Sequence, residues 1–133
     1  MTDYVDFETV MVSKLQTDLE SVVGSRVYPV QLPQGVKYPA IAYTRVDAVR
    51  VLTHDQTSAG LVASRFQFDI YGKTYGDVRA VSKALRQSLV GWQDLTLDPP
   101  VHSCLPALEQ SSVVPDVPLY RMIVDYIFNH QES

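Results

Sequence analysis

The sequence has few of the features that mark secreted or membrane proteins. It contains one cysteine, Cys104, in 133 residues, so it has no internal disulfide framework of the kind that small secreted scaffolds use. No apolar run approaches the ~18 residues of a membrane-spanning helix. The start, Met1 to Asp6, is acidic and polar, which is not typical of a signal peptide. We therefore expect neither a secreted scaffold nor a membrane protein.

An excess of basic residues is also missing. Eleven Lys and Arg stand against fifteen Asp and Glu, which gives a formal charge of −4 and disfavours a nucleic-acid-binding footprint. Hydrophobic residues make up 46% and charged residues 20%, an ordinary globular composition. The length predicts a single domain over residues 1–133 with one core.

Hydrophobic periodicity predicts two amphipathic helices. The first runs from about Asp3 to Val23 and is followed by the helix-stopping Gly24; the second runs from about Tyr75 to Leu89, behind a capping Thr74. The residues expected on the buried stripes are Phe7, Met11, Leu15, Leu19, Val22, Val78, Val81, Leu85 and Leu89.

Alternating patterns predict a long hairpin and a last strand. Ile41 to Val51 and Val62 to Tyr71 alternate with period two around a polar tip, and Leu119 to Phe128 alternates again. Shorter strands are expected at residues 26–28, 95–97 and 101–108, the last confined to a sheet edge by Pro106. Loops are expected at Pro29 to Pro39 and Gln110 to Pro118, and a loose tail at Asn129 to Ser133.

These elements predict an α+β fold in a single domain. Strands joined by hairpins, with helices segregated from them, favour an antiparallel sheet of four to five strands. Both helices would pack on one face of that sheet.

Residues that suggest chemistry have simpler explanations. Gly72-Lys73-Thr74 follows a strand and precedes a helix, like the end of a phosphate-binding loop, but Gln67 stands where that motif needs its first glycine. A turn glycine and a helix cap account for these residues. We expect no nucleotide or other cofactor.

Metal and thiol sites are equally weak in the sequence. His54, His102 and His130 lack ligand spacing, so we expect no metal. Cys104 lies two residues from His102, on the same face of an extended strand, but no third group is indicated, and a lone buried cysteine is usually inert. The residues thus indicate no catalytic site, and we expect a protein that is not an enzyme.

Charged residues favour structural roles. Asp47 and Asp69 lie on the polar faces of the hairpin strands, opposite Arg45 and Arg65, which favours cross-strand ion pairs. The basic residues Arg79, Lys83 and Arg86 line one side of the second helix; this indicates either a solvated face or a surface for an acidic partner. Eight tyrosines, and two valines at 113–114 in a polar loop, favour a binding or assembly module.

An ordered set of segments resembles one protein family. The segments are Val22-Val23-Gly24-Ser25-Arg26-Val27-Tyr28-Pro29, Leu32-Pro33-Gln34-Gly35, Tyr38-Pro39-Ala40-Ile41-Ala42-Tyr43, Arg65-Phe66-Gln67-Phe68-Asp69-Ile70-Tyr71-Gly72, Thr74-Tyr75, Leu85-Arg86-Gln87-Ser88-Leu89 and Leu119-Tyr120-Arg121-Met122-Ile123-Val124-Asp125-Tyr126. Together they resemble the small tail completion proteins of long-tailed bacteriophages, also called tail terminators or tail-to-head joining proteins. The resemblance covers almost the whole chain and is weakest over residues 94–118, where no segment is matched residue by residue.

The resemblance implies a structural virion protein. Such proteins form a homo-oligomeric ring, usually a hexamer, that caps the tail tube, ends its polymerisation and joins the head connector, while DNA passes through the lumen without specific binding. The expected location is the head-proximal end of the tail, after assembly in the bacterial host cytoplasm.

Two surfaces are expected to contact neighbours, namely the hairpin tip and a loop near residue 114. Their residues are Leu52, Thr53, His54, Asp55, Gln56, Thr57, Ser112, Val113, Val114, Pro115 and Asp116. The alternatives are another head–tail joining protein, a stopper or adaptor, and a small cytoplasmic nucleotide-binding enzyme that uses Gly72 to Thr74.

Overall fold

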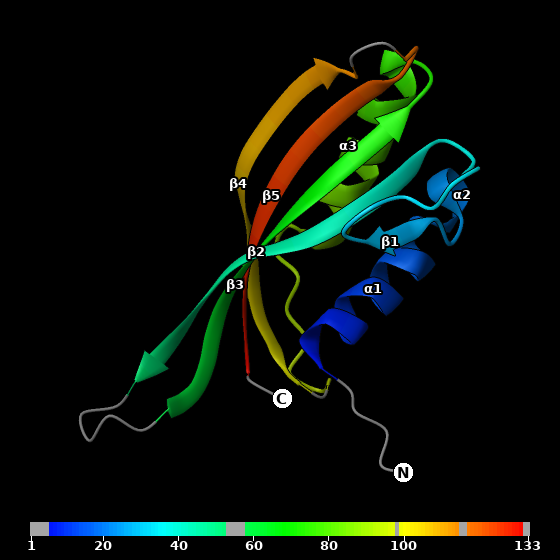
Figure 1. Cartoon of the computed structure of the whole chain (residues 1–133). Coiled ribbons are helices and arrows are strands. Elements are labelled where there is room, and N and C mark those ends of the chain that lie inside the picture. Colours follow the sequence, from blue (N-terminus) through cyan, green and yellow to red (C-terminus); the bar gives the residue numbers. More distant parts are fainter. Residues whose placement is uncertain (1–5, 53–57, 98, 115–116, 132–133) are drawn as a thin grey trace.

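The structure is a five-stranded sheet with helices on one face (Figure 1). The computed structural model describes residues 6–52, 58–97, 99–114 and 117–131. Its elements are α1 (Phe7–Asp18), α2 (Glu20–Val23), β1 (Val27–Pro29), β2 (Ala40–Leu52), β3 (Ser58–Gly72), α3 (Tyr75–Leu89), β4 (Val101–Val113) and β5 (Tyr120–Gln131). The predicted α+β fold is confirmed. None of the helices in these residues is long and apolar enough to cross a membrane.

The sheet order is β1-β2-β3-β5-β4, and one pairing differs from the expected antiparallel sheet. β2, β3, β5 and β4 pair antiparallel, but β1 pairs parallel with β2, with Val27 beside Ile41. The reason is the proline- and glycine-rich loop over residues 30–39. It carries the chain back to the level where β1 begins, so that β2 starts in the same direction as β1.

The first helix is interrupted, contrary to the continuous helix expected to Val23. Asp6 begins α1 by accepting a hydrogen bond from the Thr9 N–H at 2.9 Å. The backbone leaves helical geometry at Leu19, and the short α2 ends at Gly24, which has a φ of 59°. The break turns Val23, rather than the predicted Val22, fully into the core.

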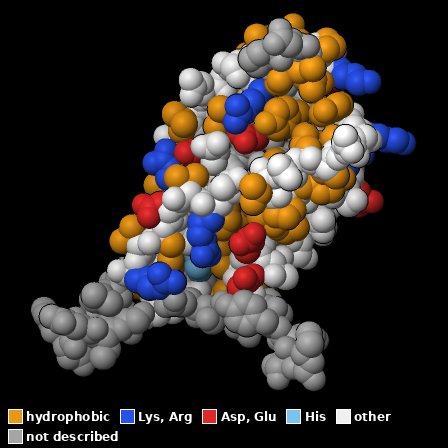
Figure 2. All heavy atoms as spheres, in the orientation of Figure 1, with side chains coloured by type: hydrophobic (Ala, Val, Ile, Leu, Met, Phe, Trp, Pro, Cys, Tyr) orange, Lys and Arg blue, Asp and Glu red, His pale blue; other side chains and the backbone are white. Residues whose placement is uncertain are grey.

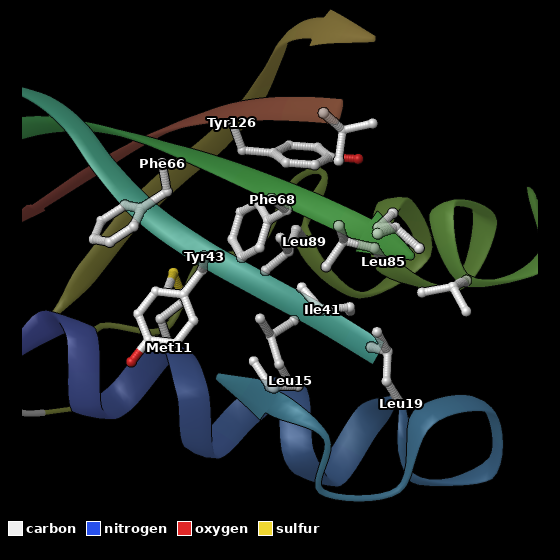
Figure 3. Close-up of a cluster of buried hydrophobic side chains, with 14 of the residues drawn as sticks. Met11, Leu15, Leu19, Ile41, Tyr43, Phe66, Phe68, Leu85, Leu89 and Tyr126 are labelled. Carbon is white, nitrogen blue, oxygen red and sulfur yellow. The ribbon is translucent and has the colours of Figure 1, made fainter. Parts of the chain in front are cut away.

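The core lies between the helices and one face of the sheet. Figure 3 shows Met11, Leu15 and Leu19 directed toward side chains of β2 and β3, with Leu85 and Leu89 of α3 beside them. An aromatic group centres on Phe66, whose ring lies 5.9 Å from that of Phe7 and 5.8 Å from that of Phe128. α3 has the predicted bounds, and Thr74 accepts its capping hydrogen bond from the Asp77 N–H at 3.1 Å.

The hairpin of β2 and β3 is longer than the rest of the sheet. β3 pairs with β5 as far as Leu61 and Gln131, whereas its pairing with β2 continues to Leu52 and Ser58. Figure 1 shows this end of the hairpin projecting away from the helices and the other strands. The hairpin therefore forms a two-stranded arm.

Between α3 and β4 the chain differs from the sequence-based expectation. Residues 95–97 form a turn and not a strand, because the Asp94 carboxylate accepts a hydrogen bond from the Thr96 N–H at 3.0 Å. β4 then continues to Val113, through residues 110–113 that were expected to be a loop. They pair with residues 120–123 of β5. Backbone pairing of this kind needs no apolar side chains, so the polar residues 110–112 gave no sequence signal for a strand.

The expected loose tail is also wrong for residues 129–131, which complete β5. His130 is buried, its Nε2 lies 2.8 Å from the Ser64 hydroxyl, and its ring stacks on Phe7 at 4.0 Å. These two partners come from distant parts of the chain, which is why the local sequence did not indicate a strand. Residues 132–133 lie outside the described residues.

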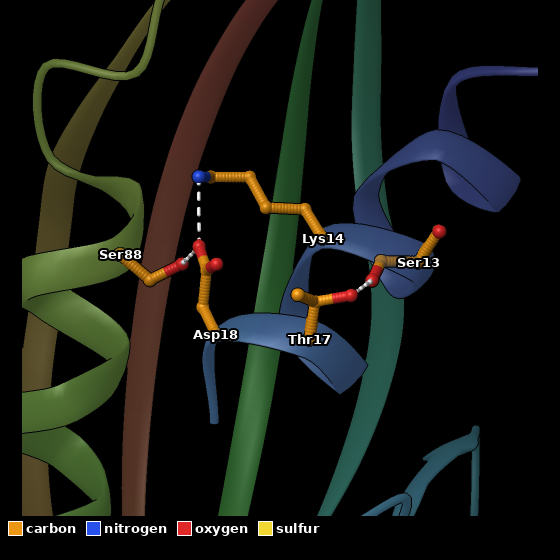
Figure 4. A network of polar contacts seen from close by, with 5 residues as sticks. All are labelled: Ser13, Lys14, Thr17, Asp18 and Ser88. Atoms are coloured by element: carbon orange, nitrogen blue, oxygen red, sulfur yellow. Dashed lines mark hydrogen bonds and ion pairs between the residues drawn. The ribbon is translucent and has the colours of Figure 1, made fainter. Parts of the chain in front are cut away.

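A polar contact joins α1 to α3 (Figure 4). The Asp18 carboxylate accepts hydrogen bonds from the Lys14 ammonium at 2.8 Å and from the Ser88 hydroxyl at 2.7 Å. The bond from Lys14, followed by that from Ser88, lowers the pKa of Asp18 below 3.8. A carboxyl group with a lowered pKa stabilises the fold above its unfolded pKa and loses that contribution as the pH falls through its folded pKa.

We predict that Asp18→Asn lowers the free energy of unfolding by about 0.5–1 kcal/mol at pH 7, the upper part of the range for a partly exposed ion pair. The difference from the wild type should shrink as the pH falls below 4, where the wild-type carboxylate also becomes protonated. Urea denaturation at pH 7 and pH 3 measures both effects. Glu20→Gln, at an exposed acid nearby, is the control and should change stability by less than about 0.5 kcal/mol at either pH.

Candidate assembly surface

The sheet has two long outer edges, on opposite sides. β4 is the last strand on one side, and its residues from Leu105 to Val113 are exposed. On the other side β1 covers β2 only as far as Tyr43, whose carbonyl accepts a hydrogen bond from the Val30 N–H at 2.8 Å. Among the described residues, the part of β2 from Thr44 onward has β3 as its only strand partner. Unpaired edges of this kind are templates for another strand.

Both edges also carry features that limit indiscriminate pairing. Pro106 lies in β4, as the sequence predicted for an edge strand, and a register shift follows it before Leu108. β2 has register shifts between Arg45 and Asp47 and again before Leu52. Bulges and proline on an edge prevent open-ended aggregation, so only a matched partner is accommodated.

The two surfaces predicted to contact neighbours lie at opposite ends of the sheet. Leu52 ends β2 beside Ser58, at the far end of the arm. Ser112 and Val113 end β4, beside Arg121 and Tyr120. Val114 follows, and its N–H donates to the Leu119 carbonyl at 2.9 Å. The fold therefore does not bring the two surfaces together within one chain.

Some of the predicted contact residues lie outside the described residues, namely Thr53, His54, Asp55, Gln56, Thr57, Pro115 and Asp116. Of the others, Val113 stands out with 64% of its surface exposed. Its role as a contact remains a prediction.

Sequence reasoning did not single out several exposed apolar residues on the two edges. Leu105 and Leu108 on β4 are 55% and 41% exposed, and Val46 and Val49 on β2 are 53% and 57% exposed. The signal for the β2 pair was present in the sequence, because both faces of the Ile41 to Val51 alternation carry apolar residues beside the charged ones. Exposed apolar side chains on both edges are typical of surfaces that become covered on assembly.

The sheet face away from the helices carries paired charges. The Arg65 guanidinium lies 2.8 Å from the Asp125 carboxylate, and that of Arg121 lies 3.1 Å from Asp69. Both pairs join β3 to β5, whereas the sequence predicted pairs between β2 and β3. Each acid lies diagonally across from its base in the β3–β5 register, which brings the charges within reach. Asp47 instead accepts a hydrogen bond from the Ala48 N–H at 2.8 Å.

On the face seen in Figure 2, basic and acidic side chains are mixed, and neither sign forms a large patch. The four paired residues contribute two charges of each sign, so they cancel. Both arginines on this face already have carboxylate partners, so the face attracts other anions only weakly.

The residues that suggested chemistry have packing roles. At Gly72 an added Cβ would lie 3.0 Å from the Val78 side chain, so the glycine allows α3 to approach the sheet. Cys104 lies in the core, where burial raises the pKa of its thiol to about 12. The described residues hold no group of three or more His, Cys, Asp or Glu that could bind a metal.

The neighbourhood of Cys104 does not form a catalytic pair. A register shift between Val101 and Ser103 interrupts the alternation of β4, and the His102 Nε2 lies 3.1 Å from the Gln131 side-chain nitrogen. With no activating base and a protonated thiol, Cys104 lacks the thiolate that nucleophilic catalysis needs.

Two of the hollows formed by the described residues lie on opposite sides of the helix layer. One, of about 570 Å³, lies between α3 and β4 and has basic side chains on its helix wall. The other, of about 450 Å³, lies between α1 and Tyr43 of β2 and includes two acids. The residues that line the first hollow are Tyr75, Gly76, Arg79, Ala80, Ser82, Lys83, Arg86, Glu109, Ser111 and Met122.

A solved structure shares this fold. A chain from a structure titled "Virion of native gene transfer agent (GTA) particle" matches with a TM-score of 0.66 and 15% sequence identity, and the match covers 90% of each chain. No curated protein sequence matches this one. At 15% identity the likeness establishes the fold alone.

The family comparison is more specific, because it matches nearly the whole sequence. The model of the family described as "Tail completion protein gp17" matches residues 9–130, from the first turn of α1 to one residue before the end of β5 at Gln131. That range includes both sheet edges, the arm and the hollow between α3 and β4, whereas Asp6 and Glu8, which line the other hollow, precede it. The chain therefore belongs to the tail completion protein gp17 family, a family of structural proteins of phage tails.

Proposed function

We propose that this protein assembles into a closed ring, usually of six copies, that caps the finished tail tube, ends its polymerisation and joins the tail to the head. The observation that carries the proposal is the pair of dissimilar open edges, β4 on one side of the sheet and β2 beyond Tyr43 on the other. Two different surfaces on opposite sides favour head-to-tail contacts, which close into a ring when the rotation between copies allows it.

The two ends of the sheet offer surfaces for two kinds of partner. The arm of β2 and β3 projects at one end, and the turn between β4 and β5 lies at the other. A joining ring needs one surface for the tail tube protein and another for the head-completion or connector protein. We assign one end of the sheet to each partner.

DNA would pass through the lumen without specific binding. The paired charges of the sheet face away from the helices support this, because Arg65 and Arg121 are already neutralised by acids. Phosphate contacts with unpaired cations are what hold proteins on DNA. We place the ring at the head-proximal end of the tail in the virion, after assembly in the host cytoplasm; the virion structure that shares the fold supports this setting.

The main alternative is a stopper or adaptor, which would bind the connector and not the tail tube. The family match favours tail completion over it. The enzyme reading is disfavoured by the packing role of Gly72 and by the buried thiol of Cys104. The function that we propose is structural and involves no catalysis.

The proposal is tested by mass and by activity on tail tubes. Six copies of 14.9 kDa have a mass of about 89 kDa, which light scattering measures across a concentration series, with negative-stain images of the same samples. A ring of that mass, or attachment of added protein to one end of isolated tail tubes, is expected. Attachment to connectors alone would favour the stopper or adaptor, and neither ring nor attachment would overturn the proposal.

At Val113, we predict that an aspartate weakens assembly and leaves the fold intact. The side chain is 64% exposed, so the free energy of unfolding should change by less than about 0.5 kcal/mol. An unpaired charge in an apolar contact should raise the concentration needed for half-assembly at least tenfold, which corresponds to about 1.4 kcal/mol. Light scattering and thermal unfolding measure the two effects.

Leu95→Asp is the matched control, because Leu95 is 56% exposed in the turn before β4 and lies on neither edge. It should leave assembly unchanged. Normal assembly of the Val113→Asp variant would remove the end of β4 from the contact surface.

A separate prediction concerns Cys104. With a pKa of about 12, only about one thiol in 10⁴ is ionised at pH 8, and the side chain has no exposed surface. The folded protein should therefore resist a thiol-reactive disulfide reagent that labels the urea-unfolded protein within minutes. Fast labelling of the folded protein would mean that Cys104 is accessible and would reopen the enzyme reading.

A further inference from the structure

The hollow between α3 and β4 is lined on its helix side by three cations that have no ion-pair partner among the described residues. Arg79, Lys83 and Arg86 recur at spacings of four and three, which places them on one face of α3, and all three are exposed. None of them forms an ion pair with a described residue; the Arg79 guanidinium lies over the Tyr75 ring at 5.9 Å. Among the described residues that line this hollow, the only acid is Glu109 on β4. The hollow therefore has a net positive charge, in a chain whose formal charge is −4.

The hollow on the opposite side of the helix layer is negative. Asp6 and Glu8 line it together with Tyr43 of β2. Burial opposes ionisation of Asp6, but hydrogen bonds from Thr9 outweigh it and lower the pKa of that carboxyl. Burial, followed by the charge of Glu8, raises the pKa of Tyr43 to about 12, so the tyrosine stays neutral. At neutral pH this hollow presents carboxylates and a neutral hydroxyl, with no basic residue among those that line it.

The two hollows lie at the same level of the sheet. Glu109 of β4 pairs with Val124, Val124 with Phe68, and Phe68 with Tyr43. This row of paired residues runs straight across the strands, from the positive hollow at one side to the negative hollow at the other. Copies placed side by side, with only a rotation about the ring axis between them, would bring the positive hollow of one against the negative hollow of the next.

We propose that the groove between α3 and β4 receives the acidic flank of α1 from a second copy of this chain, with Arg79, Lys83 and Arg86 meeting Glu8 and Asp6. The contact rests on the proposed ring and specifies which surfaces form it. It also supplies counterions on the next copy for the three cations on one face of α3, which form no ion pair with the described residues of their own chain.

A DNA phosphate chain is the rival occupant of the groove. Glu109 disfavours DNA in the groove, because its carboxylate repels the closely spaced phosphates of a DNA strand. The acidic flank of α1 has its two carboxylates close together at the start of the helix, on the capping Asp6 and on Glu8, so it fits a groove with three cations and one acid. Opposite charges at matched positions also fix the register between copies.

A charge swap between Lys83 and Glu8 tests the contact. Lys83→Glu should raise the concentration for half-assembly at least tenfold, and Glu8→Lys should do the same. The double variant, with Lys83→Glu and Glu8→Lys, should return to within about threefold of the wild type, because each ring contact then has its charges exchanged. Lys73→Glu, an exposed lysine in the turn before α3, is the control with the same charge change and should assemble normally.

One further variant and a stability measurement guard against a loss of folding. Glu8→Gln removes the charge but keeps an acceptor for the Tyr43 hydroxyl, so it separates the ion pair from that hydrogen bond. Thermal unfolding of every variant should match the wild type. Lys83 and Glu8 lie on opposite flanks of the same chain, so they cannot compensate for each other within one copy. Rescue by the double variant would therefore report a contact between copies and not a repaired fold.

Each outcome separates the contact from the ring itself. If the wild type forms no ring, in solution or on tail tubes, the proposed function fails and this contact falls with it. If the wild type forms a ring and Lys83→Glu assembles normally, the ring stands and the contact is overturned. If the double variant stays defective while wild-type protein, but not Lys83→Glu, binds a fluorescent duplex DNA at low salt, the groove holds phosphate and the contact is overturned.

Discussion

Packing of α1 and α3 against a single face of the sheet is the constraint on which the rest of the structure depends. Phe7 illustrates this packing, because its ring, near the start of α1, contacts the rings of Phe66, Phe128 and His130. This contact fixes α1 against the end of β5, and the Asp18 contact fixes α1 against α3. Since the helices occupy one face only, the other face and both outer edges remain outside the core and are open to other molecules.

The sequence predicted the helices and strands in which buried side chains recur at a regular spacing. α3 and the long hairpin were found because burial on one side imposes spacings of 3.6 and 2. The parallel pairing of β1, the extension of β4 to Val113 and the end of β5 were not found. These depend on backbone hydrogen bonds between distant segments, and the polar residues from Gln110 to Ser112 carry no sign of them. His130 is the plainest case, because its burial depends on Phe7 and Ser64.

The candidate assembly surface was predictable in part. Val113 attracted attention as an apolar residue in a polar segment, and the structure leaves it exposed at the end of an edge strand. The spacing of Arg79, Lys83 and Arg86 showed the basic face of α3, but it favoured a solvated face, with an acidic partner as the alternative. The sequence could not predict that Glu109 and Tyr43 lie in one row of paired residues across the sheet, because the registers of three strand pairs create that row. Only the folded sheet shows that the positive and negative hollows share one level.

The head-to-tail contact is tested most directly by covalent linkage between copies. A variant with Lys83→Cys and Glu8→Cys, treated with a short bismaleimide linker, should give a ladder of linked species that ends at the mass of the closed ring. Cys104 is buried and should not react. Each single-cysteine variant should give no ladder, because a head-to-tail contact joins two different positions. Dimers from a single-cysteine variant, or no linkage in the double variant under conditions where rings are seen, would contradict the account.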